Sequence, residues 1–259
     1  MTQTSKEAGI FLSAEWRDLV MLNYQVDPRL LRDYVPRGTE LDSFQGKTLV
    51  SLVGFQFLQT KLLGVLPLPF HTNFDEVNLR FYVRRHTDDG DRRGVVFIHE
   101  IVPKRAVAML ARLAYGENYS CYPMRHRVTS NVASKSVVYE WQLPSGWAKL
   151  RAEVAGEPSL SPRLDSPSTW EPIMPSDGSI EQFITDHYWG YSAQRDGGPV
   201  EYHVTHPQWR VWRSSRAGFE GDAAEIYGSA FSKALQRPPD SAFIADGSPV
   251  VVHAGKRIA

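Results

Sequence analysis

The chain has 259 residues, of which 42% are hydrophobic and 22% charged, so we expect a packed globular core. Lys plus Arg and Asp plus Glu number 29 each, and this formal net charge of zero removes the electrostatic argument for a nucleic-acid partner. The single cysteine, Cys121, excludes an intrachain disulfide, and the first residues contain no apolar segment typical of a signal peptide. The most apolar run, residues 62–70, is too short to span a bilayer and contains two prolines. We therefore expect a cytoplasmic protein without a membrane partner.

Many short segments rich in Val, Phe, Tyr and Trp alternate between apolar and polar residues, as β-strands do. Turn signals such as the DDGD stretch at 88–91 separate them. Strands at this spacing without regular intervening helices predict a mainly β protein built as an antiparallel sheet or barrel. The predicted strands are 18–26, 47–59, 75–85, 94–102, 120–129, 134–143, 148–154, 200–206 and 242–253.

The predicted helices are few and short. They are expected after Asp27, over 104–115, from Ser179 and over 223–235. Pro28 suits the first helical position after an Asp27 cap, and Gln182 completes a capping-box pattern with Ser179. Gly228 weakens the last helix. The proline-rich stretch 157–178 is interpreted as a long crossing loop because strand-like segments continue after it, so residues 1–259 are expected to form a single domain.

The sequence FDEVNLRFYV at 74–83 has one apolar face and one polar face. The polar face carries Glu76, Asn78 and Arg80. Alternate residues of a strand lie about 6.8 Å apart, so the α-carbons of Glu76 and Arg80 are separated by about 13 Å and each side chain needs another partner. Such a face either meets solvent, as most polar strand faces do, or lines a pocket.

The segments that resemble a nucleotide-binding, metal-binding or nucleophilic-cysteine motif each lack residues or elements that the motif requires. The GKT at 46–48 lacks the upstream glycine and the following helix of a phosphate-binding loop. On a strand, His203 and His206 would point to opposite faces, and Pro207 argues against a helix. No base is paired in sequence with Cys121. We therefore predict no metal and no cofactor.

Five segments in order resemble the YqjF-like family, an uncharacterised group in the acetoacetate decarboxylase-like superfamily. They are FDEVNLRFYV, ARLAYGENYSCYPM, HYWGY, EYHVTHPQW and ADGSPVVVH, and the resemblance runs from about residue 13 to the end. It implies a cone-shaped antiparallel β-barrel with an added sheet and a few peripheral helices, enclosing a small-molecule pocket. It also implies that the face carrying Glu76 points into that pocket, which would then take its ligand through Glu76, Asn78, Arg80 and Tyr119.

The decarboxylases of that superfamily act through a lysine that forms a Schiff base beside a second lysine. In the matching order of strand, helix, segment and strand, this pair falls on Tyr119 and Ser120, which cannot form an imine. A rival alignment places the nucleophile at Lys104, although Lys104 precedes the helix. We therefore expect no acetoacetate-type decarboxylase.

Two functions stay open. The first is a pocket for a small carboxylate or carbonyl compound; the residues do not decide whether it is an enzyme, and any chemistry would be lyase-like or acid–base without a Schiff base. The second is a non-catalytic ligand-binding or interaction protein in which the polar residues form a structural network. A homo-oligomer is compatible with either.

Overall fold

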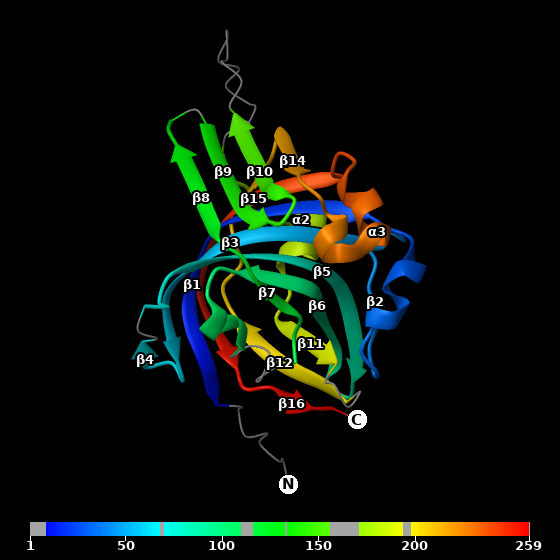
Figure 1. Ribbon diagram of the computed structural model, residues 1–259. Coiled ribbons are helices and arrows are strands. Elements are labelled where there is room, and N and C mark those ends of the chain that lie inside the picture. Colours follow the sequence, from blue (N-terminus) through cyan, green and yellow to red (C-terminus); the bar gives the residue numbers. More distant parts are fainter. Residues whose placement is uncertain are drawn as a thin grey trace.

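The computed structural model describes residues 9–67, 70–109, 116–132, 134–155, 171–193 and 198–258. Strands dominate these residues, and helices are short and peripheral (Figure 1). The strands are β1 (Ile10–Gln25), β2 (Glu40–Leu41), β3 (Leu49–Leu62), β4 (Leu66–Pro67), β5 (Phe74–Thr87), β6 (Gly90–Val102), β7 (Tyr119–Cys121), β8 (Met124–Ser130), β9 (Ser134–Leu143), β10 (Gly146–Ala155), β11 (Trp189–Ala193), β12 (Pro199–Thr205), β13 (Val211–Arg213), β14 (Arg216–Glu220), β15 (Ser241–His253) and β16 (Lys256–Arg257). The helices are the 3₁₀ helix η1 (Pro28–Tyr34), α2 (Ile180–Thr185) and α3 (Ala224–Leu235).

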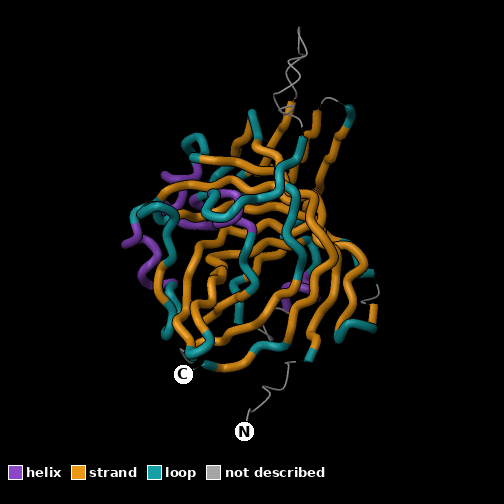
Figure 2. The backbone as a smooth tube through the Cα atoms, turned by 180° about the vertical axis from the view of Figure 1, so that it is seen from behind, coloured by secondary structure: helices purple, strands orange, loops and turns teal. Residues whose placement is uncertain are grey.

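The large sheet closes into a barrel. Its order runs β15-β1-β3-β5-β6-β11-β12, and a further pairing of β12 with β15, through Val204 and Val252, returns to the start. Figure 2 shows these strands curving around a common centre. Among the described strands, β6 pairs in parallel with β11 and with β7, so the sheet is mixed. The mainly β barrel with an added sheet that the sequence predicted is confirmed, but the expectation that the barrel is antiparallel throughout is corrected by these two parallel pairings.

A second, antiparallel sheet of order β14-β10-β9-β8 packs against the outside of the barrel. Its strands rise together above the barrel in Figure 1. Tyr139 and Leu150 of this sheet lie so close to β3 that a Cβ at Gly54 would come within 2.7 Å of Tyr139 and 2.8 Å of Leu150. The missing side chain of Gly54 therefore allows the added sheet to sit directly on the barrel wall.

Strand β5 is buried on both faces, which answers the question raised by its alternation. Val77, Leu79, Phe81 and Val83 belong to the core shared with the added sheet and α3. The opposite face, including Glu76, Asn78 and Arg80, points into the barrel and is equally buried. The expectation of a central strand with its polar face inside is confirmed.

Two predicted strands differ most from the structure in their bounds. The segment 120–129 is two strands, because Pro123 interrupts the ladder between β7 in the barrel and β8 in the added sheet. Strand β1 starts at Ile10 rather than at residue 18, since a bulge near Asp18, whose φ is +52°, breaks the alternation.

The predicted caps are confirmed. The Asp27 side chain accepts a hydrogen bond from the Arg29 amide at the start of η1, and Ser179 accepts one from the Gln182 amide at the start of α2. Gly228 interrupts α3 with a φ of +76°.

Residues 105–109 are helical as expected, whereas the rest of the predicted helix 104–115 and most of the loop 157–178 lie outside the described residues. In the described part of the chain, the helices are all too short or too polar to cross a membrane.

Candidate functional site

A cavity of about 130 Å³ lies inside the barrel. Its volume is close to the roughly 150 Å³ of an engineered cavity that takes up benzene, so it suits a molecule of about that size. Aromatic side chains form much of its wall. They include Trp16, Phe55, Phe57, Phe74, Phe97 and Trp209.

The polar face of β5 supplies one row of cavity residues. Glu76, Asn78 and Arg80 are only 3%, 1% and 8% exposed. The Asn78 amide donates to Glu76 across 3.0 Å, and the Tyr119 hydroxyl donates to the other oxygen of Glu76 across 3.4 Å. Within the described residues Glu76 and Arg80 make no ion pair, as their separation along the strand predicted.

Two further glutamates, the buried Glu100 and the half-buried Glu117, join Glu76 in the cavity, and we call Glu76, Glu100 and Glu117 the carboxyl cluster. Glu100 on β6 is the ladder partner of Asn78, and Tyr119 on β7 is the ladder partner of Glu100. Asn78, Glu100 and Tyr119 therefore form one row across neighbouring strands. Glu117 accepts a hydrogen bond from the Tyr202 hydroxyl across 2.7 Å.

Burial raises the pKa of every member of the carboxyl cluster. It raises the pKa of Glu76 to about 8 and that of Glu117 to about 7, against the hydrogen bonds from Asn78 and Tyr202. The pKa of Glu100 lies well above its ordinary value, through burial and through the nearby carboxylates. The cluster consequently holds protons near neutral pH, where exposed glutamates are ionised.

Sequence reasoning did not find Glu100 and Glu117. Alternation from Phe97 places His99 and Ile101 on the cavity face, but a β-bulge in the β5–β6 ladder shifts the period between Leu79 and Arg80. Glu100 turns inward as a result, while His99 bonds Ser120 and packs against Tyr227 on the outside.

Arg80 and His187 form the other polar end of the cavity. Arg80 donates through Nη2 to the Ile184 carbonyl across 3.1 Å. His187 lies 2.6 Å from the Phe183 carbonyl through Nε2. A carbonyl only accepts, so Nε2 carries the hydrogen and Nδ1 has the lone pair. Burial, together with Arg93 and Arg80, holds the pKa of His187 well below its ordinary value, so the ring is neutral.

Four buried polar atoms of these residues have no hydrogen-bond partner. They are Asn78 Oδ1, Arg80 Nε, Glu100 Oε2 and His187 Nδ1. An unpartnered buried polar atom costs about 1–3 kcal/mol, so such atoms are rare in folded proteins. Their concentration in one cavity marks it as a site where a bound group would complete the hydrogen bonding.

Of the two histidines considered as metal ligands in the sequence, His206 lines the cavity, and His203 is not among its described lining residues. His203 stacks on His253, and His206 stacks on Trp209; within the described residues no three metal-binding side chains come together. Lys104 is half-buried at the start of the helical segment and is not among the described cavity residues, none of which is a lysine.

The most deeply buried glutamate outside the cavity has cationic partners. Glu201, which is 0% exposed, contacts Arg85, Arg92 and Lys256 at 3.0, 2.7 and 3.5 Å. Burial raises its pKa, but Arg85, Arg92 and the Tyr191 hydroxyl outweigh that effect and lower the pKa overall.

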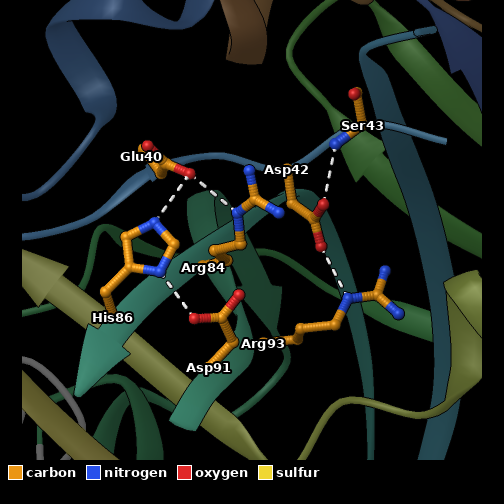
Figure 3. A network of polar contacts seen from close by, with 7 residues as sticks. All are labelled: Glu40, Asp42, Ser43, Arg84, His86, Asp91 and Arg93. Carbon is orange, nitrogen blue, oxygen red and sulfur yellow. Dashed lines mark hydrogen bonds and ion pairs between the residues drawn. The ribbon is translucent and has the colours of Figure 1, made fainter. Parts of the chain in front are cut away.

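A surface network follows the same rule. Glu40 bonds Arg84 and His86, and Asp42 bonds Arg93 across 2.6 Å (Figure 3). Each of these acids faces a basic group, whereas the carboxyl cluster has no such partner among the described residues.

Solved structures identify the class of fold. Acetoacetate decarboxylase from Legionella pneumophila matches with a TM-score of 0.63 at 14% identity, covering 96% of this chain and 87% of that one. An acetoacetate decarboxylase-like enzyme from Sphingomonas wittichii RW1 matches with a TM-score of 0.61 at 13% identity, covering 100% and 98%. The enduracididine biosynthesis enzyme MppR complexed with pyruvate matches with a TM-score of 0.63 at 13% identity, covering 99% and 93%. The protein therefore has an acetoacetate decarboxylase-like fold, and identities this low show the fold alone.

The sequence identifies the family more narrowly. The chain belongs to the DUF2071 family of uncharacterised conserved proteins, whose sequence model matches residues 13–249. The uncharacterised protein YqjF of Bacillus subtilis is 32% identical over 76 residues, which is 29% of this chain and 31% of YqjF. The predicted relationship to YqjF is confirmed.

Proposed function

We propose that the protein holds a small carboxylate or carbonyl compound in the barrel cavity, through Arg80, Asn78, Glu76 and Tyr119, without Schiff-base chemistry. The observation that carries the proposal is Arg80. It is buried, it has no acidic partner among the described residues, and its Nε has no hydrogen-bond acceptor. A buried charge without a partner is very costly, and the guanidinium fork suits a carboxylate or an enolate oxygen.

The opposite end of the cavity supports a carbonyl group. Burial raises the pKa of Glu76 to about 8 and that of Tyr119 well above its ordinary value, so both groups carry protons near neutral pH. A protonated carboxyl and a phenol donate hydrogen bonds to a carbonyl oxygen. A carboxyl with a pKa near the working pH can also give and take a proton, which is the basis of acid–base catalysis.

A non-catalytic binding protein is the second candidate function. It would use the same cavity, and the absence of lysine from the described cavity residues favours it over Schiff-base chemistry. Turnover separates the two: NMR spectra of the probe compound recorded over time with the protein would change for an enzyme and stay constant for a binding protein. A cytoplasmic location is a further expectation, which cell fractionation tests.

Ligand-induced stabilisation tests the proposal. Butyrate and 3-oxobutyrate are titrated into the wild type and Arg80→Gln while thermal unfolding is followed. A ligand at 100 times its Kd should stabilise the wild type by about 2.7 kcal/mol, and Arg80→Gln should lose that effect. Arg210→Gln is the matched control, because Arg210 pairs with Asp246 at the surface. Equal stabilisation of wild type and Arg80→Gln, or none in the wild type, would reject the cavity as the binding site.

Reductive trapping tests the statement about chemistry. Incubation with 3-oxobutyrate and borohydride should leave the intact mass unchanged, because no lysine is among the described cavity residues. A stable adduct that maps to Lys104 would show that the Schiff-base reaction occurs from an unexpected position.

A further inference from the structure

The row formed by Asn78 and Glu100 lacks donors rather than acceptors. These two residues are ladder partners on β5 and β6, so their β-carbons lie about 4.5–5.5 Å apart. Asn78 Oδ1 and Glu100 Oε2 are both buried without a hydrogen-bond partner, and both are acceptors once the Glu100 carboxyl is ionised. The Asn78 amide donates to Glu76, and Glu100 already has hydrogen bonds with Glu117 and Tyr119. A ligand group that satisfies both atoms must therefore donate more than one hydrogen bond.

A carbonyl oxygen cannot do this, because it only accepts. An ammonium group has three donors and no acceptor, so it matches two neighbouring acceptors beside several carboxyl groups. Metal ions are a poorer match, since within the described residues no three acidic or histidine side chains come close enough to hold one. The aromatic wall, which includes Phe74 and Phe97, also favours an organic cation.

The charges around the carboxyl cluster also indicate a cationic ligand group. The carboxyl cluster has no cation from the described chain within ion-pair distance, whereas the buried Glu201 contacts three. Arg80 is the nearest cationic residue along β5, and it is engaged with the Ile184 carbonyl. A cation brought by the ligand would provide the missing partner.

We infer that the ligand is a small amino carboxylate, whose ammonium group lies against Asn78 and the carboxyl cluster while its carboxylate lies on Arg80. The inference rests on the proposed function and narrows its ligand class. Asn78 and Arg80 are alternate residues of β5, separated by about 6.8 Å, which matches the reach of a short chain with one charged group at each end. The cavity of about 130 Å³ has room for such a molecule.

Protonation supplies a signature of this binding mode. Besides the cluster itself, the titratable and charged groups that line the described cavity are Tyr119, Tyr202, Arg80, His187 and His206, and burial lowers the pKa of His206. Tyr119 stays protonated and His187 stays neutral near neutral pH. Any proton released there on ligand binding therefore comes from the carboxyl cluster. An ammonium favours ionised carboxylates, so its binding should release protons, and its affinity should rise as pH increases through about 7 to 8.

A matched pair of probes tests the inference. 3-Aminobutyrate and 3-oxobutyrate differ only in an amine or a ketone on the same carbon. Calorimetric titration at about pH 8, in two buffers of different ionisation enthalpy, gives both the affinity and the protons released. We expect the amine to bind the wild type at least about tenfold more tightly, with proton release, since a charge-assisted bond is stronger than a neutral one. Glu100→Gln should abolish the preference, while Glu140→Gln, which removes a surface partner of Arg125, should keep it.

The outcomes separate the two proposals. If the ketone binds equally or more tightly, or if Glu100→Gln keeps the preference for the amine, the inference is wrong and the proposed function stands. Failure of both compounds to bind the wild type would overturn the proposed function and the inference with it. Binding of the amine without proton release would show that the ammonium does not contact the carboxyl cluster, which also rejects the inference.

Discussion

Glu201 is as buried as Glu76 and Glu100 of the carboxyl cluster, yet its electrostatics are opposite to theirs. Glu201 contacts two arginines, a lysine and a tyrosine, and its pKa is lowered. Glu76, Glu100 and Glu117 contact amide, phenol and carboxyl groups, and the pKa of each is raised. Burial alone thus says little about the role of a glutamate. The neighbouring groups decide whether the carboxylate forms ion pairs that stabilise the fold, or lacks a cationic partner that a ligand could supply.

The largest expected difference between the two regions is in stability. Glu201→Gln leaves Arg85 without its acid and Arg92 with only the exposed Asp89, and both arginines are about one-fifth exposed. Removing one partner of a buried pair typically costs about 3–5 kcal/mol of unfolding free energy. Glu100→Gln removes a carboxyl that is already protonated, so it should cost less than about 1 kcal/mol at about pH 6. Urea unfolding of both variants measures this, and equal losses would remove the distinction between the two regions.

The pH dependence of stability should also differ in sign. The raised pKa values of Glu76 and Glu117 mean that the folded protein binds more protons than the unfolded chain between about pH 4.5 and 8. The free energy of unfolding should therefore fall as pH rises across that range, by up to about 1.4 kcal/mol per pH unit for each group. Glu201 acts in the other direction, because its lowered pKa adds stability above 4.5 that is lost as pH falls below it.

Glu76→Gln isolates the contribution of the cavity. The variant should show a shallower fall of unfolding free energy with pH, and above about pH 8 it should be more stable than the wild type. Urea unfolding at a series of pH values measures both effects. If wild type and variant give parallel curves, Glu76 is not protonated in the fold.

Gly190 tests how the cavity wall holds Glu117. Gly190 is the ladder partner of Tyr202, and a Cβ at this position would overlap the Tyr202 ring. Gly190→Ala should displace that ring, cost about 1–3 kcal/mol and raise the pKa of Glu117, whose hydrogen bond from Tyr202 is lost. Tyr202→Phe removes the hydroxyl without the overlap, so it should raise the pKa of Glu117 with a smaller loss of stability. Carboxyl NMR and urea unfolding report the two quantities; an unchanged pKa in both variants would exclude this contact.

The smallest expected effect is a gain. Arg80→Met replaces a buried cation without an acid by an apolar side chain of similar length, which should raise the stability of the ligand-free protein by about 1 kcal/mol. Arg92→Met, which removes a partner of Glu201, should lower stability. A loss in both variants would mean that Arg80 is as structurally paired as Arg92.

The sequence predicted those features that depend on local periodicity. The alternation in residues 74–83 identified β5, and the side chains that it placed together, Glu76, Asn78 and Arg80, do share the cavity. Ser179 and Asp27 marked helix starts because capping is local.

The sequence did not predict the features that depend on strand register and on β-bulges. The bulge in the β5–β6 ladder turns Glu100 inward, against the alternation from Phe97. Glu201 looked like any polar strand residue, because its partners Arg85, Arg92 and Lys256 meet it only in the folded sheet. The position of the neutral His187 at the Arg80 end of the cavity was not predicted for the same reason, since the segment between α2 and β11 carries it there.

Carboxyl NMR titration of the protein labelled at the glutamate side chains tests the central claim most directly. Glu→Gln variants assign the signals of Glu76, Glu117 and Glu201. In the ligand-free protein we expect Glu76 to titrate near pH 8 and Glu117 near pH 7, while Glu201 stays ionised to below pH 4.5. If Glu76 and Glu117 instead titrate near 4.5, as exposed glutamates do, the cavity carboxylates are paired or solvated. That result would contradict the claim that they are buried without a cationic partner.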